Sequence, residues 1–185
     1  MGKVYRNRAK TIIGSTEYID VGNHRHIPAK IDTGADSSAI WASHIRIAKD
    51  GILHFCLFDQ GSPYYTGEVI KRKDYKVAVV RSAFGHEQIR YRTHISAIIN
   101  GRRIRILFNL SNRSKNNFPV LIGRRTISGK FLVDVSEKRA TVPHRNDKSL
   151  KFQRLLEKNP YEFHQKFIQK TNHNINNNKT NRKGE

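Results

Sequence analysis

The sequence has one cysteine, few acidic residues and no long apolar run. A single cysteine, Cys56, excludes an internal disulfide and favours a reducing compartment. No apolar stretch reaches the roughly 18 residues that a membrane-spanning helix requires. Residues 1–10 are basic, but they are not followed by the apolar segment of a signal peptide. We therefore expect a cytoplasmic protein with no membrane partner.

The scarcity of acidic residues leaves a strongly positive chain. The 15 acidic residues stand against 35 lysines and arginines, for a formal net charge of +20. Residues 1–144 hold 25 of the basic and 11 of the acidic residues, so this part alone carries +14. Such a field attracts polyanions, including nucleic acid and acidic peptides, without selecting among them. A basic composition that serves no particular partner is the alternative.

Changes in composition divide the chain into four segments. We expect a basic arm over 1–10, a folded domain over 11–142, a helical extension over 143–171 and a disordered tail over 172–185. The extension has apolar residues at helical spacing, and a second helix is predicted to begin at Asn159-Pro160. Its helices are expected to serve as packing or partner surfaces.

The folded domain shows the signals of an all-β protein. Short apolar segments alternate with turns, and Asp50-Gly51 and Asn100-Gly101 are strong hairpin signals. Pro28 indicates that part of its strand lies on a sheet edge. The strands are predicted over 11–22 (two short strands around Gly14), 25–31, 38–42, 45–48, 52–58, 75–80, 88–93, 95–99, 103–108, 118–122 and 131–135. Such a series describes a β-barrel or sandwich.

The candidate functional motif is Asp32-Thr33-Gly34, which follows an apolar strand directly. Gly34 allows a backbone conformation closed to other residues, so backbone N–H groups can point at the Asp32 carboxylate. An ordinary Asx-type turn explains the same three residues equally well. The motif alone does not decide between a turn and a site.

Two motifs in a fixed order resemble the retropepsin-like aspartic proteases. Asp32-Thr33-Gly34-Ala35 comes first, Leu121-Ile122-Gly123-Arg124 comes late, and a hairpin with a small-residue tip lies between them. More narrowly, the chain resembles the bacterial family named ATP-dependent zinc proteases and regarded as retropepsin-like aspartic endopeptidases. Gly14-x-x-Glu17 and Val80-Arg81-Ser82 add to this resemblance, which covers roughly residues 11–136. It implies a closed β-barrel with one short helix after Ile-Gly-Arg.

The resemblance also implies a mechanism and a site. Two aspartates share one proton around a water, and this chain offers one Asp-Thr-Gly, so Asp32 must meet Asp32 of a second copy in a homodimer. Thr33 would join the two loops, and Gly34 would let backbone N–H groups approach the carboxylates. The positive charge of Arg81 and Arg90 favours acidic substrates. The substrate contacts implied are Ala35, Asp36, Arg81, Ser82, Ala83, Phe84, Gly85 and Ile122.

Two other functions are compatible with the sequence. One is a non-catalytic basic barrel that binds acidic proteins or RNA. The other is a zinc-dependent peptidase, but the nine histidines include no H-E-x-x-H, and His24 and His26 lack a third ligand at recognisable spacing. The phosphate-binding pattern G-x-x-x-x-G-K-[ST] is absent as well. We therefore expect neither a metal nor another cofactor.

Overall fold

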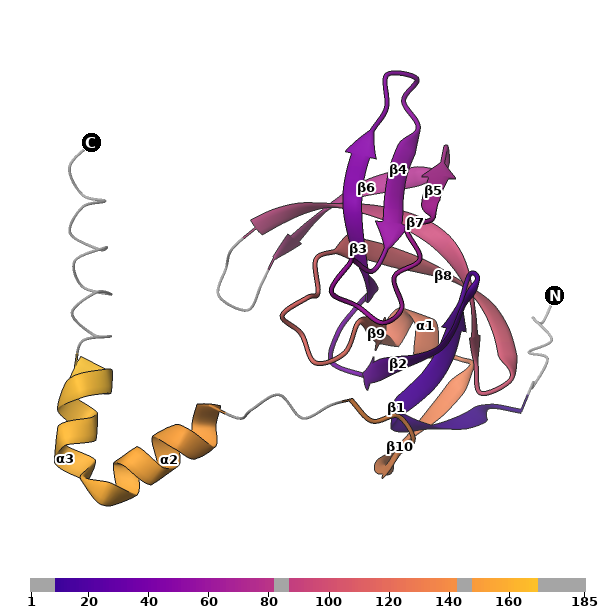
Figure 1. Cartoon of the computed structure of the whole chain (residues 1–185). Helices are drawn as coiled ribbons and strands as arrows, with labels where there is room; N and C mark the ends of the chain where they lie inside the picture. Colours follow the sequence, from indigo (N-terminus) through magenta and orange to yellow (C-terminus); the bar gives the residue numbers. More distant parts are fainter. Residues whose placement is uncertain (1–8, 82–86, 143–147, 170–185) are drawn as a thin grey trace. The chain divides into compact units, whose positions relative to one another are not determined.

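The computed structural model describes residues 9–81, 87–142 and 148–169. By its internal contacts the chain divides into two compact units, Met1–Val142 and Pro143–Glu185. Figure 1 shows the first as rich in strands and the second as helical. The elements of the first unit are β1 (Thr11–Val21), β2 (His24–Asp32), β3 (Ser38–Ile47), β4 (Leu53–Leu57), β5 (Val69–Arg72), β6 (Tyr75–Arg81), β7 (Glu87–Ile99), β8 (Arg102–Ser111), β9 (Val120–Gly123), α1 (Arg124–Ile127) and β10 (Phe131–Lys138).

The strands of the first unit close into a barrel. They follow the order β10-β1-β2-β9-β3-β8-β7-β6. An antiparallel pairing of β1 with β7, with Ile19 opposite Ile99, joins β1, β2, β9, β3, β8 and β7 into a ring. Outside the ring, β10 pairs parallel to β1, β6 extends β7, and β4 with β5 extends β3. The predicted all-β barrel with a short helix after Ile-Gly-Arg is therefore confirmed.

The two strongest turn signals of the sequence correspond to turns in the structure. Asn100 and Gly101 both have positive φ, 43° and 74°, as a two-residue type I′ turn requires, and Ile99 pairs with Arg102 across it. The turn that contains Gly51 joins β3 to β4. Pro28 lies where β2 pairs with β1 only, because the pairing with β9 begins one residue later at Ala29.

Three strands that are continuous in the structure were each predicted as two short strands. β1 runs through Gly14 because a register irregularity between Gly14 and Thr16 absorbs the glycine. β3 likewise runs from residue 38 to residue 47, and β7 continues through His94, which pairs with Leu107. β5 was not predicted; it is a four-residue strand with two charged residues that pairs with β4. Four residues are too few for a clear alternating pattern.

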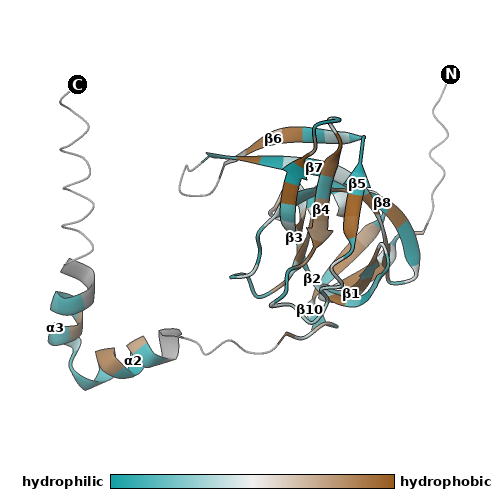
Figure 2. Ribbon diagram, turned by 45° about the horizontal axis from the view of Figure 1, so that its top comes forward, coloured by the Kyte–Doolittle hydropathy of each residue, from teal (hydrophilic) through white to brown (hydrophobic). Residues whose placement is uncertain are grey.

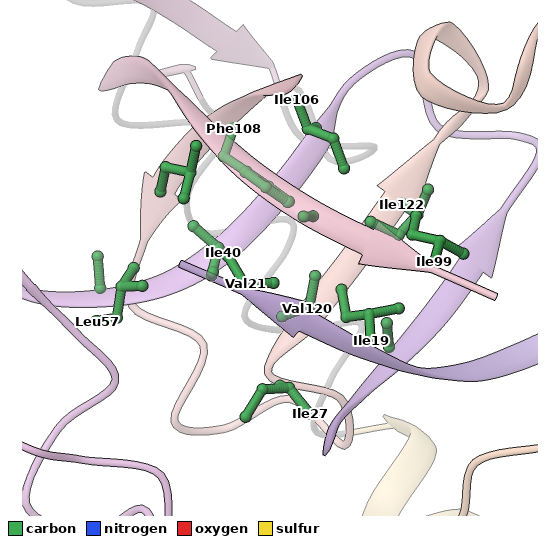
Figure 3. Packing of buried hydrophobic residues seen from close by; sticks show 14 of the residues in the cluster. Ile19, Val21, Ile27, Ile40, Leu57, Ile99, Ile106, Phe108, Val120 and Ile122 are labelled. Atoms are coloured by element: carbon green, nitrogen blue, oxygen red, sulfur yellow. The ribbon is translucent and has the colours of Figure 1, made fainter. Parts of the chain in front are cut away.

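The barrel core is formed by the inward faces of these strands (Figure 3). In Figure 2 apolar and polar residues alternate along several strands, as half-buried strands require. Full burial of one such side chain contributes about 1.5–3 kcal/mol. The largest fully buried side chains include Phe55, Phe58, Phe108, Ile13, Ile19, Ile27, Ile40, Ile99 and Ile122.

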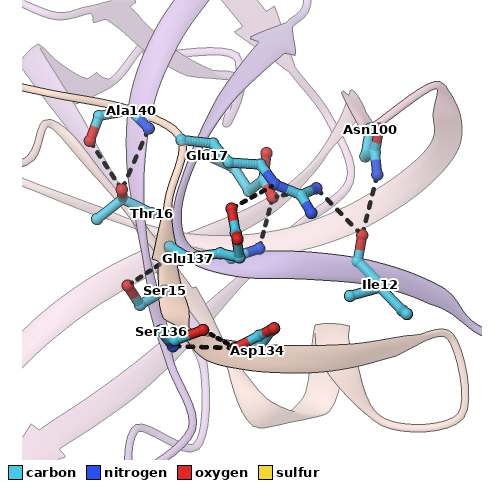
Figure 4. Close-up of polar contacts among 11 residues, drawn as sticks. Ile12, Ser15, Thr16, Glu17, Asn100, Asp134, Ser136, Glu137 and Ala140 are labelled. Atoms are coloured by element: carbon cyan, nitrogen blue, oxygen red, sulfur yellow. Dashed lines mark hydrogen bonds and ion pairs between the residues drawn. The ribbon is translucent and has the colours of Figure 1, made fainter.

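Glu17 is a buried carboxylate that ties β1 to the end of β10 (Figure 4). Its Oε1 accepts hydrogen bonds from the Gly14 backbone N–H at 2.6 Å and from Arg139 Nη1 at 3.2 Å. A Cβ on Gly14 would approach the Glu137 carbonyl oxygen to 2.6 Å, so only glycine fits beside β10. The Gly14-x-x-Glu17 pattern is thus a structural clamp.

The second unit is helical where it is described. It contains α2 (Lys148–Lys158), α3 (Pro160–Phe163) and a π-helical turn, η1 (His164–Gln169). Asn159 caps α3, because its side chain accepts a hydrogen bond from the Glu162 N–H at 3.2 Å. The helix predicted to begin at Asn159-Pro160 is therefore present. The tail predicted to be disordered, 172–185, lies outside the described residues.

Candidate active site

Asp32 is the last residue of β2, and its carboxylate is held by the turn that follows. Its Oδ1 accepts the backbone N–H of Gly34 at 3.1 Å and of Ala35 at 3.2 Å. The Ala35 N–H also lies 3.3 Å from the Asp32 carbonyl oxygen, which closes the turn. The Asp32 residue is half-buried, whereas Thr33 and Gly34 are exposed at the surface of the loop. The expected backbone N–H groups do point at the carboxylate.

Gly123 brings the Ile-Gly-Arg segment into contact with this loop. β9 pairs parallel to β2, which places Gly123 opposite Asp32 and Ile122 opposite Ile31. A Cβ on Gly123 would lie 2.6 Å from the Ser37 carbonyl carbon and 2.8 Å from the Ala35 carbonyl oxygen. The φ of Gly123 is −86°, so steric contact, and not backbone conformation, requires glycine here. Ile122 itself is fully buried in the barrel core.

A buried serine joins the loop to α1 and β8. Ser38 Oγ accepts the Gly123 N–H at 3.0 Å and lies 2.8 Å from Thr126 Oγ1. The Ser38 carbonyl oxygen accepts a hydrogen bond from Asn109 Nδ2 at 3.1 Å. Ser38, Asn109 and Thr126 are not among the site residues predicted from the sequence. The available signal was a polar residue at the start of an otherwise apolar segment.

Asp36 turns toward α1. Its carboxylate forms ion pairs with Arg124 and, at 3.2 Å, with Arg125. The backbone N–H of Arg124 donates to the Ala35 carbonyl at 2.8 Å, and that of Arg125 donates to the Asp36 carbonyl at 3.2 Å. All three side chains are largely exposed, so each ion pair contributes little stability by itself. The backbone bonds and ion pairs together fix the edge of the loop.

Arg113 lies close to Asp32 and to a second arginine, Arg90. Burial lowers the pKa of the Arg113 guanidinium, the nearby charge of Arg90 lowers it further, and the Asp32 carboxylate raises it. Burial also lowers the pKa of Arg90. Arg113 lies in the polar loop after β8 and was missed by the sequence analysis, which singled out Arg90 on charge alone. Arg113 is therefore close enough to Asp32 for the two charges to interact.

A groove of about 450 Å³ is lined by Arg90 and by Asn112, the residue before Arg113. Its walls come from the end of β3, the start of β7 and the end of β8. The polar and charged residues on these walls are Ser43, His44, Asp59, Gln88, Arg90, Tyr91, Ser111 and Asn112.

The predicted hairpin contacts can be placed only in part. Arg81 ends β6, where it pairs with Glu87 of β7. Ser82, Ala83, Phe84 and Gly85 lie outside the described residues.

The two histidines considered as metal ligands belong to packing contacts. His24 is buried edge-on to Phe58, with ring centroids 5.1 Å apart, and His26 stacks on Tyr18 at 3.7 Å. Across the described ranges, no group of three or more His, Cys, Asp or Glu side chains could hold a metal ion. Within the same ranges, no helix is both long and apolar enough to cross a membrane.

The closed barrel, the strand-end aspartate and the glycine strand packed on its loop define a retropepsin-like protein. The chain belongs to the RimB-like family of retropepsin-like aspartic endopeptidases, whose family model matches residues 12–144. The predicted family is thus confirmed. A solved structure of a protein of unknown function from Legionella pneumophila has a TM-score of 0.55 at 24% identity, covering 71% of this chain and 98% of that one. That likeness concerns the fold alone.

Two curated relatives carry a different name. Proteins of Shewanella pealeana and Shewanella halifaxensis, each named a probable alpha-L-glutamate ligase, are 30% identical to this chain over 133 residues. The match covers 69% of this chain but only 29% of each relative. The chain therefore spans less than a third of their length.

Proposed function

We propose that this chain is an aspartic endopeptidase in which Asp32 is the catalytic carboxylate. The observation that carries the proposal is the Asp32 turn, where Oδ1 accepts two backbone N–H groups. In the described part of the chain Oδ2 accepts no hydrogen bond, so it is available to a water or a substrate. Membership of a family of aspartic endopeptidases supports this assignment.

The mechanism needs a second carboxylate, which we propose comes from Asp32 of another copy. One carboxylate takes a proton from water as general base, and the other, protonated, polarises the scissile carbonyl. Two carboxylates this close share one proton because they cannot both ionise. A symmetric homodimer brings the two Asp32 loops together at its axis. The exposed Thr33 is suited to hold the loops together there, and Gly34 to close approach.

The substrate we propose is an extended, acidic polypeptide. The net charge of +20 and the position of Arg113 close to Asp32 favour acidic partners. Two relatives are named for a reaction on glutamate, which agrees with this choice. Ala35 and Asp36 would contact substrate at the loop edge, while buried Ile122 would support the loop from beneath. The roles of Arg81 and of Ser82 to Gly85 rest on the resemblance.

The decisive test is Asp32→Asn in the full chain. Loss of the general base should lower peptide cleavage by about 10²- to 10⁴-fold. Cleavage of acidic peptides is measured by mass spectrometry, with circular dichroism and sedimentation as controls for fold and dimer. Asp50→Asn is the matched control, because Asp50 only caps the Ile52 N–H in the turn between β3 and β4. Full activity in Asp32→Asn, or cleavage by a strict monomer, contradicts the proposal.

The names of the two relatives support a second candidate, a part in alpha-L-glutamate ligation. This candidate predicts ATP-dependent addition of labelled glutamate to an acceptor peptide. The peptidase predicts cleavage without ATP. One incubation with and without ATP therefore separates the two.

The basic charge supports a third candidate, binding of acidic proteins or RNA without catalysis. Such binding should weaken steeply with salt and should not change in Asp32→Asn. Titration of a labelled RNA and an acidic peptide at two salt concentrations measures both properties.

A further inference from the structure

We propose that Arg113 and Arg90 form a subsite beside Asp32 that binds a carboxylate of the substrate. The inference rests on the proposed peptidase function and assigns a role to Arg113. The carboxylate can belong to an acidic side chain or to the C-terminus of the substrate, because both present the same planar group.

The barrel brings the two arginines together from different strands. Arg92 of β7 pairs with Asn109 of β8, and from there the two strands run to Arg90 and to Ser111. Arg113 follows two residues after the end of β8. Arg90, Ser111 and Asn112 line the same groove. The subsite therefore lies where β7 and β8 separate.

Each arginine is anchored through its Nε atom. Arg113 Nε donates to the Phe118 carbonyl at 3.1 Å, close to where β9 begins its pairing with β2. Arg90 Nε donates to Gln88 Oε1 at 2.9 Å. Within the described ranges no hydrogen bond engages their terminal amino groups, and no carboxylate lies at ion-pair distance from either. The amino groups that a carboxylate would meet are therefore available.

The electrostatics of this pair call for an anion. Two partly buried guanidinium groups of like charge repel each other and have lost part of their hydration. Asp32 is close enough to raise the pKa of Arg113 but forms no ion pair with it. Asp36 is unavailable, because Arg124 and Arg125 hold its carboxylate. Asp59 also lines the groove, but its carboxylate lies 4.0 Å from His44 and at ion-pair distance from neither Arg90 nor Arg113 among the described residues. A bound carboxylate would supply the missing charge.

Arginine is the suitable residue for this ligand. Its planar guanidinium matches a carboxylate with two parallel hydrogen bonds, whereas a lysine offers a point charge. Arg113→Lys should therefore recover only part of the binding, although it keeps the charge. If the role of Arg113 is purely structural, its substitution should lower the kcat/KM of acidic and neutral peptides by the same factor.

The test compares peptide pairs that differ by Glu against Gln at one position, each with a free and with an amidated C-terminus. In Arg113→Gln the ratio of kcat/KM for Glu over Gln peptides should fall by about tenfold, the usual weight of one charge-assisted hydrogen bond. If Arg113→Gln lowers kcat/KM for peptides with a free C-terminus more than for amidated peptides, whether they carry Glu or Gln, then the bound carboxylate is the C-terminus. Arg103→Gln, an exposed arginine on β8, is the matched control and should keep the native ratio.

Binding to the Asp32→Asn protein gives a second measurement that needs no catalysis. Adding Arg113→Gln should weaken binding of the Glu peptide by about tenfold and leave the Gln peptide nearly unaffected. A Glu-over-Gln ratio that Arg113→Gln does not change, in cleavage or in binding, overturns the subsite and leaves the peptidase standing. Native cleavage that persists in Asp32→Asn overturns the peptidase mechanism instead.

Discussion

The loop around Asp32 and the β6–β7 hairpin are held in opposite ways. The loop is fixed by its own turn, by the Ser38 hydroxyl, by contact with Gly123 and by the ion pairs of Asp36. The hairpin extends past the last pairing of β7 with β8 at Arg92, and beyond that point β6 is the only strand that pairs with β7 among the described residues. Its residues Val77, Val79 and Ile89 are exposed.

The firmly held loop carries the proposed catalytic residue Asp32, whereas the hairpin is held by fewer contacts. Catalytic groups must be held in a narrow range of positions, which many short contacts provide. A two-stranded extension with an exposed apolar face has fewer contacts and a lower local stability. We therefore expect substitutions in the loop to affect both folding and catalysis, and substitutions in the hairpin to leave folding unchanged.

Gly123→Ala should have the largest effect on the loop. The new methyl group would lie 2.6–2.8 Å from the backbone of Ser37 and Ala35, neither of which can move aside as a side chain can. Overpacking of this kind costs about 1–3 kcal/mol or more, and the displaced Asp32 should also lose activity. Chemical denaturation and peptide cleavage measure the two effects. Gly61→Ala, with open space around it, is the control and should match the native chain.

Some of this site could be predicted from the sequence and some could not. Asp32-Thr33-Gly34 and Asn100-Gly101 are local signals, because the residues of each motif themselves form the turn. Ser38, Asn109 and Arg113 act through contacts with residues far along the chain.

Long-range parallel pairing explains the difference. β2 with β9 and β3 with β8 pair in parallel across more than 60 intervening residues, and no turn signal marks such a pairing. In the sequence, Arg113 is one basic residue in a polar loop, and no local pattern distinguishes it. Its proximity to Arg90 and Asp32 appears once the barrel is closed.

Ser38→Ala tests the loop without adding volume. Removing the hydroxyl leaves the buried Gly123 N–H without its acceptor, which costs about 1–3 kcal/mol. The free energy of unfolding should fall by that amount, with a smaller loss of activity. Ser15→Ala is the matched control, because the Ser15 hydroxyl bonds the Glu137 carbonyl at an exposed position. An equal loss in both variants would contradict a special role for the loop.

We expect buried His24 to make the stability of the barrel depend on pH. Burial lowers the pKa of His24, and the charge of Glu68 and the Val21 backbone carbonyl oppose this only in part. The contact with Val21 falls short of full hydrogen-bond geometry, so burial dominates. The unfolded chain therefore binds a proton more readily, and the free energy of unfolding should fall as pH drops below about 6.5.

His24→Phe should remove this part of the pH dependence and leave a shallower slope between neutral and mildly acidic pH. Urea denaturation at several pH values measures the slope. His26→Asn is the control, because His26 is exposed and Asn tolerates its positive φ of 54°. A slope that His24→Phe does not change would contradict the assignment.

Ile89→Ser should have the smallest effect, and it tests the hairpin side of the contrast. Ile89 is 69% exposed and pairs with Val79, which is 63% exposed, so serine removes little buried surface. The free energy of unfolding should change by no more than about 0.5 kcal/mol. Ile99→Ser, in the same strand but fully buried, should cost several-fold more, because it opens a cavity and buries a hydroxyl. A large loss in Ile89→Ser would mean that the apolar face is covered in the native protein, and the hairpin would then be as firmly held as the loop.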